Sequence, residues 1–201
     1  MSSQTGTTWL TPEEYLAIER QAEWRSEYID GVMYAMAGSA FKHAQIVSNL
    51  ITGLGLQLRN RDCSVLAIQM KVRLPDSKKF FYPDLAIVCG KPRFHDEETD
   101  VILNPVLLIE VFSESTEYFD RGRKFKYYQQ LDCLREYLLV AQDRVAIEQF
   151  IKQANGVWLY ATVADRESSL PLPSIECTLD LSAVYDKVDW KEYERSSTDD
   201  E

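Results

Sequence analysis

The sequence lacks the long apolar run that a membrane-spanning helix requires, which is about 20 consecutive apolar residues. Its first residues, Met1 to Thr8, are polar and uncharged, without the basic and apolar regions of a signal peptide. We therefore expect no membrane partner and a cytoplasmic location.

Cysteine is scarce, and its spacing excludes a common class of metal site. The four cysteines are Cys63, Cys89, Cys133 and Cys177, and no CxxC pair exists, which argues against a zinc site or a redox motif. Three of them lie in or beside apolar or β-branched runs, where a free cysteine behaves as a small hydrophobe. We expect reduced, structural thiols.

Positive charge is also in short supply. The chain has 22 Lys and Arg against 32 Asp and Glu, a net charge of −10. Tight binding of nucleic acid usually needs a basic surface, because phosphate neutralisation drives affinity. Part of the acidity is peripheral, at residues 95–98 and 196–201. Even so, the composition excludes strong non-specific DNA binding by the whole surface.

Length and composition indicate one globular domain. The 201 residues are 45% hydrophobic and 27% charged, a globular balance, and they contain no internal repeat and no long linker. We expect a flexible N-terminus over residues 1–10, a single domain over 11–190 and an acidic flexible tail over 191–201.

Local signals predict three helices and a hairpin. Thr11-Pro12-Glu13-Glu14 has the pattern of a capping box at the start of the first helix. Asp30-Gly31 between apolar runs predicts a two-residue β-hairpin turn. Apolar residues at helical spacing predict a second helix over about 39–59, and a third is expected over about 116–131.

Apolar runs predict strands over residues 65–74, 80–88, 106–112, 136–140, 145–151 and 157–163. Pro171 and Pro173 predict a loop before a short terminal segment around 181–185.

Two acidic residues, Asp84 and Glu110, stand in strongly apolar strands. A carboxylate there suffers a desolvation cost of several kcal/mol unless a cation or a hydrogen-bonded partner compensates it. If the two strands are neighbours, both carboxylates can converge on one Mg²⁺, which prefers oxygen ligands. The alternative is a pair of structural carboxylates in ion pairs, and the residues alone leave both open.

The third predicted helix carries a basic run. Lys124 and Tyr128 are four residues apart and therefore share a helix face. An ammonium group at that position could stabilise charge that develops on a phosphate, or position an attacking water. The alternative is a solvated basic face.

Five segments, in order, carry a resemblance to a known family. They are 27–31 (EYIDG), 82–84 (YPD), 109–116 (IEVFSEST), 120–128 (DRGRKFKYY) and 134–140 (LREYLLV). This order resembles the Uma-two family of restriction-endonuclease-like proteins, in the PD-(D/E)XK nuclease superfamily, from about Thr11 to about Tyr185. The resemblance implies an α/β fold of the α+β type. It would have a central mixed β-sheet flanked by helices, with an N-terminal helix and β-hairpin.

The resemblance also implies a site. Pro83-Asp84 would be the "PD" element, Asp84 and Glu110 would hold Mg²⁺, with Mn²⁺ possible, and Glu27 would be a further acid near the metal. The lysine expected two residues after Glu110 is Phe112 in this chain, and Lys124 is the matching basic position. A histidine, His43, matches the family pattern early in the second helix, where it could assist proton transfer or contact a phosphate. The alternative is a capping or packing role. Asp84, Glu110, Lys124, Glu27 and His43 are therefore the predicted catalytic residues.

The implied activity is metal-dependent endonucleolytic cleavage of DNA, without an organic cofactor. Candidate contacts to the DNA backbone are Arg59, Arg61, Lys71, Arg73, Arg121, Arg123, Lys126 and Tyr128. Gln69 and Lys71 could line the site or lie exposed. A homodimer would suit double-strand cleavage.

Two other functions stay open at this point. One is a catalytically inactive nuclease fold that acts as a nucleic-acid or protein binding module. The other is an interaction protein in which Asp84 and Glu110 are simply ion-paired.

Overall fold

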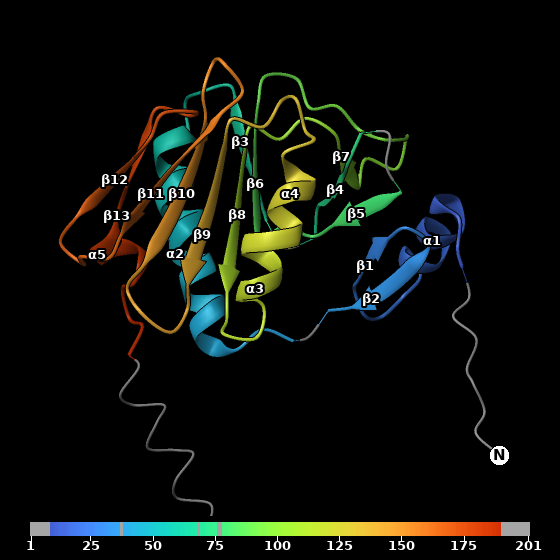
Figure 1. The fold of residues 1–201 in the computed structure, drawn as a ribbon, viewed down its shortest axis with the longest axis horizontal. Coiled ribbons are helices and arrows are strands. Elements are labelled where there is room, and N and C mark those ends of the chain that lie inside the picture. Colours follow the sequence, from blue (N-terminus) through green and yellow to red (C-terminus); the bar gives the residue numbers. More distant parts are fainter. Residues whose placement is uncertain (1–8, 37, 68, 76–77, 190–201) are drawn as a thin grey trace, which may run out of the picture.

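The computed structural model describes residues 9–189, apart from 37, 68, 76 and 77. The predicted acidic tail and most of the predicted flexible N-terminus lie outside the described residues. The chain forms an α+β fold in which helices pack on two β-sheets, with a short third sheet beside them (Figure 1). Within these described ranges, no helix is long and apolar enough to cross a membrane.

The larger sheet is mixed, as the sequence predicted. Its six strands lie in the order β11-β10-β9-β8-β6-β3, and only β8 and β9 run parallel. Their bounds are Trp158–Val163 (β11), Ile147–Lys152 (β10), Glu136–Ala141 (β9), Leu107–Phe112 (β8), Leu85–Cys89 (β6) and Cys63–Ala67 (β3).

Successive side chains of β8 point to opposite faces of this sheet. The odd-numbered ones share a hydrophobic core with α2 (Phe41–Leu58), and Leu108 and Phe112 share a second core with the helical segment that follows β8. That segment consists of α3 (Glu117–Phe119), one π-helical turn η1 (Asp120–Lys124) and α4 (Phe125–Tyr128). The alternation places Glu110 on the same face as α3 and α4, opposite α2 (Figure 1).

The smaller sheet contains the predicted hairpin. Its strands are β2 (Val32–Ala35), β1 (Ser26–Ile29), β5 (Lys79–Phe81), β4 (Lys71–Arg73) and β7 (Val101–Ile102), in that order. Asp30 and Gly31 both have positive φ, 48° and 99°, as the tight turn between β1 and β2 requires. Helix α1 (Pro12–Glu19) begins at Thr11 with the predicted capping box.

Two predicted strands are each split in two. Residues 65–74 form β3 and β4, and residues 80–88 form β5 and β6, so the chain passes twice between the sheets. The second break falls at Tyr82, Pro83 and Asp84. Pro83 has no N–H to donate to a sheet ladder, which ends β5 and leaves Asp84 between the two sheets.

The loop predicted around Pro171 is wrong. Pro171 lies in β12 (Ser169–Leu172), which pairs with β13 (Cys177–Asp180) as a separate two-stranded sheet before α5 (Leu181–Val184). Burial alternates strictly along both strands, and their apolar side chains join the core around α2. In such a ribbon proline is tolerated because no further strand among the described residues pairs with the outer side of β12, where the carbonyl of Pro171 accepts a hydrogen bond from Gln149.

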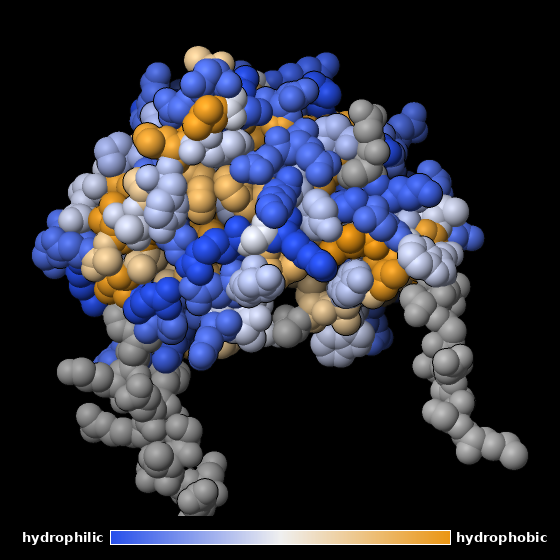
Figure 2. All heavy atoms as spheres, viewed as in Figure 1, coloured by the Kyte–Doolittle hydropathy of each residue, from blue (hydrophilic) through white to orange (hydrophobic). Residues whose placement is uncertain are grey.

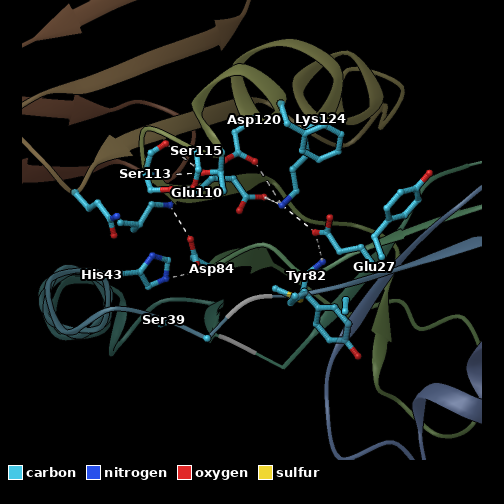
Figure 3. A pocket seen from close by; sticks show the side chains of 18 of the residues that line it. Glu27, Ser39, His43, Tyr82, Asp84, Glu110, Ser113, Ser115, Asp120 and Lys124 are labelled. Carbon is cyan, nitrogen blue, oxygen red and sulfur yellow. Dashed lines mark hydrogen bonds and ion pairs between the residues drawn. The ribbon is translucent and has the colours of Figure 1, made fainter.

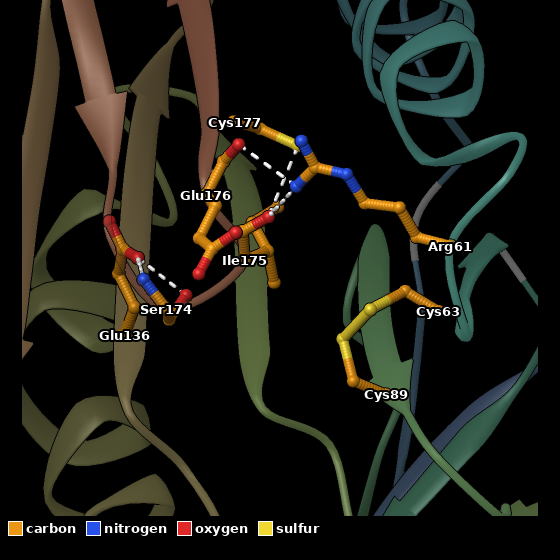
Figure 4. Close-up of a disulfide and its surroundings, with 8 residues drawn as sticks. All are labelled: Arg61, Cys63, Cys89, Glu136, Ser174, Ile175, Glu176 and Cys177. Atoms are coloured by element: carbon orange, nitrogen blue, oxygen red, sulfur yellow. Dashed lines mark hydrogen bonds between the residues drawn. A yellow bond between two sulfur atoms is a disulfide. The ribbon is translucent and has the colours of Figure 1, made fainter.

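The prediction of four reduced thiols is also wrong. Cys63 and Cys89 form a disulfide between β3 and β6 (Figure 4). The two residues are direct partners in the antiparallel register, with their Cα atoms 4.0 Å apart. Only Cys133 and Cys177 are free. The pairing depends on strand register, which the sequence spacing does not reveal.

Candidate active site

A cavity of about 670 Å³ lies where the two sheets, α2 and the η1 turn meet (Figure 3). The predicted site residues Glu27, His43, Asp84, Glu110 and Lys124 all line it. They come from β1, the first turn of α2, the β5–β6 connection, β8 and η1. The fold therefore gathers in one place the five residues predicted as catalytic, although they are widely separated in the sequence.

Asp84 is held from two sides. Its Oδ2 accepts a hydrogen bond of 2.7 Å from the backbone N–H of Val111, and its Oδ1 lies 2.9 Å from Nε2 of His43. Burial lowers the pKa of His43, but the hydrogen bond and the negative charge of Asp84 outweigh burial, so the pKa is raised above its ordinary value. His43 therefore orients the Asp84 carboxylate.

Glu110 is buried on β8, and both of its contacts fall on one oxygen. Oε1 accepts a hydrogen bond from the hydroxyl of Tyr128 at 2.9 Å and lies 2.9 Å from Nζ of Lys124. The predicted shared face of Lys124 and Tyr128 is confirmed, because both side chains reach the same carboxylate. Neither of these contacts involves the second oxygen, Oε2.

Lys124 is buried among acids. Its Nζ lies 3.0 Å from Glu27 Oε1 and 3.9 Å from Asp120 Oδ1, in addition to its contact with Glu110. Lys124 ends the π-helical turn, a feature that is often found at functional sites. The alternative of a solvated basic face is therefore wrong for Lys124.

The cavity holds more negative than positive charge. Four carboxylates line it, from Glu27, Asp84, Glu110 and Asp120, while the only buried ammonium among the described lining residues is that of Lys124. Burial raises the pKa of Glu110 well above its ordinary value and raises that of Asp120, and neighbouring carboxylates add to both shifts. Burial opposes the charge of Lys124, but attraction to Glu110, Glu27 and Asp120 outweighs it and raises the pKa. The cluster therefore favours binding of a further positive charge.

Two carboxylates at this cavity, Asp84 and Glu110, could hold a magnesium ion. Mg²⁺ commonly takes one or two carboxylates and keeps several waters. Asp84 and Glu110 both present oxygens to the cavity (Figure 3). In the part of the chain that the structure describes, no group of three or more His, Cys, Asp or Glu forms a metal cluster by itself. Water or phosphate would complete the coordination.

Most predicted DNA contacts are engaged elsewhere. Lys71 is buried and pairs with Asp100 at 2.8 Å, and Tyr128 is fully buried. The others lie as follows: Arg73 contacts His95, Arg121 pairs with Glu117 and Glu148, and Arg61 binds the backbone oxygens of Ile175 and Glu176. Arg59, Gln69 and Lys126 are exposed but do not line the cavity. Arg123 is exposed and lines the cavity, and DNA contacts by Arg59, Arg123 and Lys126 stay predictions.

Sequence reasoning missed Asp120 and Tyr34 as lining residues. Asp120 precedes Lys124 by one helical turn, so the spacing that singled out Tyr128 would also have found it. Tyr34 is the direct cross-strand partner of Glu27, which the Asp30-Gly31 turn already implies.

Comparison with known proteins finds relatives of this chain and a solved structure of the same fold. Two relatives are the uncharacterized proteins sll1609 and slr1290 of Synechocystis sp., 34% and 35% identical over 153 and 178 residues. These matches cover 76% and 88% of this chain and 86% and 91% of the relatives. A crystal structure described as a putative nuclease belonging to DUF820 from Anabaena variabilis has a TM-score of 0.70 at 17% identity. It covers 88% of this chain and 97% of that chain, and it shows a shared fold.

A model of the Uma2 family, described as "putative restriction endonuclease", matches residues 12–183. The chain belongs to the Uma2 family, as the order of its motifs predicted.

Proposed function

We propose that this chain is a metal-dependent endonuclease that hydrolyses phosphodiester bonds in DNA. One observation carries the proposal: four carboxylates meet at an open cavity, whose described lining has one buried ammonium, Lys124, and one exposed guanidinium, Arg123, to balance them. Such an excess of negative charge is stabilised by a divalent cation. The family whose model matches residues 12–183 is described as "putative restriction endonuclease", which supports the same function.

Asp84 and Glu110 would hold Mg²⁺, or Mn²⁺ in its place. The metal, when bound, would polarise the phosphate and lower the pKa of a water molecule. The backbone N–H of Val111 and the His43 ring keep the Asp84 carboxylate in place, and partners of this kind typically strengthen metal binding.

Lys124 would act through its charge. Because its pKa is raised, it stays protonated near neutral pH and cannot accept a proton from water. A protonated ammonium beside Glu110 can stabilise the negative charge that develops on the phosphate during cleavage. In this assignment Lys124, in the helical segment after β8, takes the role of the lysine that the family resemblance leads one to expect at position 112, where this chain has Phe112.

The rival function is a nuclease fold that binds without cutting. It is favoured by the direct contacts of Lys124 with Glu27 and Glu110, which neutralise part of the site without a metal. It is also favoured by the net charge of −10. A binding module would bind DNA equally well with and without the Asp84 carboxylate.

A metal titration of cleavage distinguishes the two. Supercoiled, linear and single-stranded DNA would be incubated with Mg²⁺ or Mn²⁺ and either the natural protein or Asp84→Ala. Asp132→Ala is a matched control, because Asp132 is exposed and does not line the cavity. We expect metal-dependent cleavage that Asp84→Ala abolishes and Asp132→Ala retains. Absence of cleavage of every substrate with either metal would overturn the proposal. Gel filtration of the same samples tests the expected homodimer.

A further inference from the structure

We propose that the cavity accepts an unpaired nucleotide, whose base packs against Tyr34 while its phosphate lies at the carboxylates. This inference rests on the proposed function and names its substrate class: single-stranded or locally unpaired DNA. It follows from the shape, exposure and charge of the cavity wall formed by the β1–β2 hairpin.

The hairpin register places an aromatic ring beside the acidic cluster. Glu27 and Tyr34 are direct cross-strand partners, so their side chains leave the same face of the hairpin as close neighbours. Ile29 and Met36 lie on this face by the same alternation, and all four residues line the cavity. The wall next to Glu27 is therefore apolar and aromatic.

Ile29 packs partly against the core that contains Phe81 and Tyr128, but the other apolar residues of this wall, Tyr34 and Met36, are exposed. Tyr28, on the opposite face of β1, is fully buried and stacks on Tyr15. In contrast, Tyr34 is 51% exposed and Met36 is 39% exposed, and neither belongs to a hydrophobic core. Figure 2 shows apolar side chains between hydrophilic ones over the smaller sheet. Exposed aromatic side chains in a groove that tracks nucleic acid commonly stack on unpaired bases.

Size and charge both favour a single strand. A cavity of about 670 Å³ is in the usual range for sites that enclose a small ligand or one nucleotide. A duplex presents two phosphate backbones and needs many basic contacts. Of the predicted basic contacts, only Arg123 lines the cavity. A single strand needs fewer phosphate contacts, and stacking supplies the remaining affinity.

Binding and cleavage of matched substrates test the inference. The probes are a single strand of about 12 nucleotides and its duplex, with binding measured by fluorescence anisotropy in Ca²⁺ and cleavage measured in Mg²⁺. The variants are Tyr34→Ala and Tyr34→Phe. Tyr160→Ala is the matched control, because Tyr160 is 54% exposed on β11 and does not line the cavity.

We expect the single strand to bind more tightly than the duplex. Tyr34→Ala should weaken binding of the single strand about 5- to 100-fold, whereas Tyr34→Phe should stay within about twofold, since stacking needs only the ring. Tyr160→Ala should have no effect. Thermal unfolding checks that each variant is folded.

Three results would overturn the inference. The duplex could bind as tightly as the single strand, or Tyr34→Ala could behave as Tyr160→Ala does. Alternatively, Tyr34→Ala could dissociate a dimer without changing the affinity for DNA, which would make the hairpin an interface between copies. If the natural protein cleaves duplex DNA well in the same assay, the proposed function stands and only the substrate class is wrong. If it cleaves neither probe, the proposed function fails as well.

Discussion

Nζ of Lys124 lies 2.9 Å from Oε1 of Glu110, across the gap between the π-helical turn and strand β8. Phe112, two residues after Glu110, is buried in the same face of the sheet. The position where the superfamily pattern has a lysine is thus apolar, and an ammonium reaches the carboxylate from the following helix instead. The contact is observed, while its part in cleavage stays a prediction.

Lys124→Met should reduce the rate of DNA cleavage about 100- to 1,000-fold, the usual effect of removing one group that stabilises transition-state charge. It should also lower the free energy of unfolding by about 3 kcal/mol, because Glu27 and Glu110 lose their buried partner. Initial cleavage rates and urea unfolding measure the two effects. Lys91→Met is the control, since Lys91 is exposed and does not line the cavity. Equal cleavage by both variants would remove Lys124 from the mechanism.

Metal binding should depend on pH with a definite sign. The pKa values of Glu110 and Asp120 are raised, so the metal-free fold holds protons that the unfolded chain releases. The stability that these groups contribute is fully present below their ordinary pKa values, near 4, and is lost as pH rises through the raised values. A cation replaces those protons.

The increase in melting temperature caused by Mg²⁺ should therefore be larger at pH 8 than at pH 5. Differential scanning fluorimetry at both pH values, with and without EDTA, measures it. An increase that is independent of pH would mean that Mg²⁺ does not bind at the cavity carboxylates.

His43→Ala should weaken the affinity for Mg²⁺ about 10- to 100-fold, because a positioning residue of a metal-binding carboxylate is lost. The readout is the Mg²⁺ concentration that gives half of the maximal cleavage rate, compared with the maximal rate itself. If His43 only positions Asp84, the substitution should raise the half-maximal Mg²⁺ concentration more than it lowers the maximal rate. His95→Ala is the control, since the ring of His95 contacts Arg73 and Phe80 outside the cavity. A loss confined to the maximal rate would instead indicate proton transfer by His43.

Lys71 and Asp100 should affect stability and not DNA binding. Asp100 pairs with buried Lys71 at 2.8 Å and with Arg20 at 2.7 Å, and the hydrogen bond from Arg20 is the main cause of its lowered pKa. Asp100→Asn should reduce the free energy of unfolding by about 2 kcal/mol at pH 7, since partial exposure of Asp100 moderates the loss. The difference should diminish as the pH falls through the lowered pKa. Unchanged affinity for DNA, measured alongside, separates this prediction from a phosphate-binding role for Lys71.

Much of this site could be predicted from local patterns. An acid in an apolar run, as at Asp84 and Glu110, is visible in the sequence because its desolvation demands a partner, although Asp84 lies between two strands and not within one. The four-residue spacing of Lys124 and Tyr128 correctly indicated a shared helix face. These features depend on periodicity within one element, which a sequence carries directly.

The remaining features depend on contacts between distant segments. From the sequence alone, the basic run from Arg121 to Lys124 cannot be distinguished from a solvated helix face. Only the structure shows that Glu27, from the hairpin in the other sheet, pairs with Lys124. Lys71 was predicted to contact DNA, either lining the site or lying exposed. Its actual partner, Asp100, is brought to it by the pairing of β7 with β4, which the sequence does not reveal. The disulfide depends on the register of β3 against β6.

Reduction of the Cys63–Cys89 disulfide should lower the free energy of unfolding by about 3 kcal/mol. The cross-link closes a loop with a sequence separation of 26, and its main expected effect is to restrict the unfolded chain. Urea unfolding with and without dithiothreitol measures the change, and Cys63→Ala combined with Cys89→Ala should reproduce it. Alkylation mass spectrometry of the unreduced protein should find two free thiols, Cys133 and Cys177. Four alkylated cysteines would contradict the pairing.

The most direct test of the account is to count bound Mn²⁺ by electron paramagnetic resonance in the natural protein and in Asp84→Asn. If Asp84 and Glu110 share a cation, the natural protein binds one Mn²⁺ per chain, Mg²⁺ displaces it, and Asp84→Asn binds it at least tenfold more weakly. Equal Mn²⁺ binding by the two proteins, or none by either, would contradict the central claim.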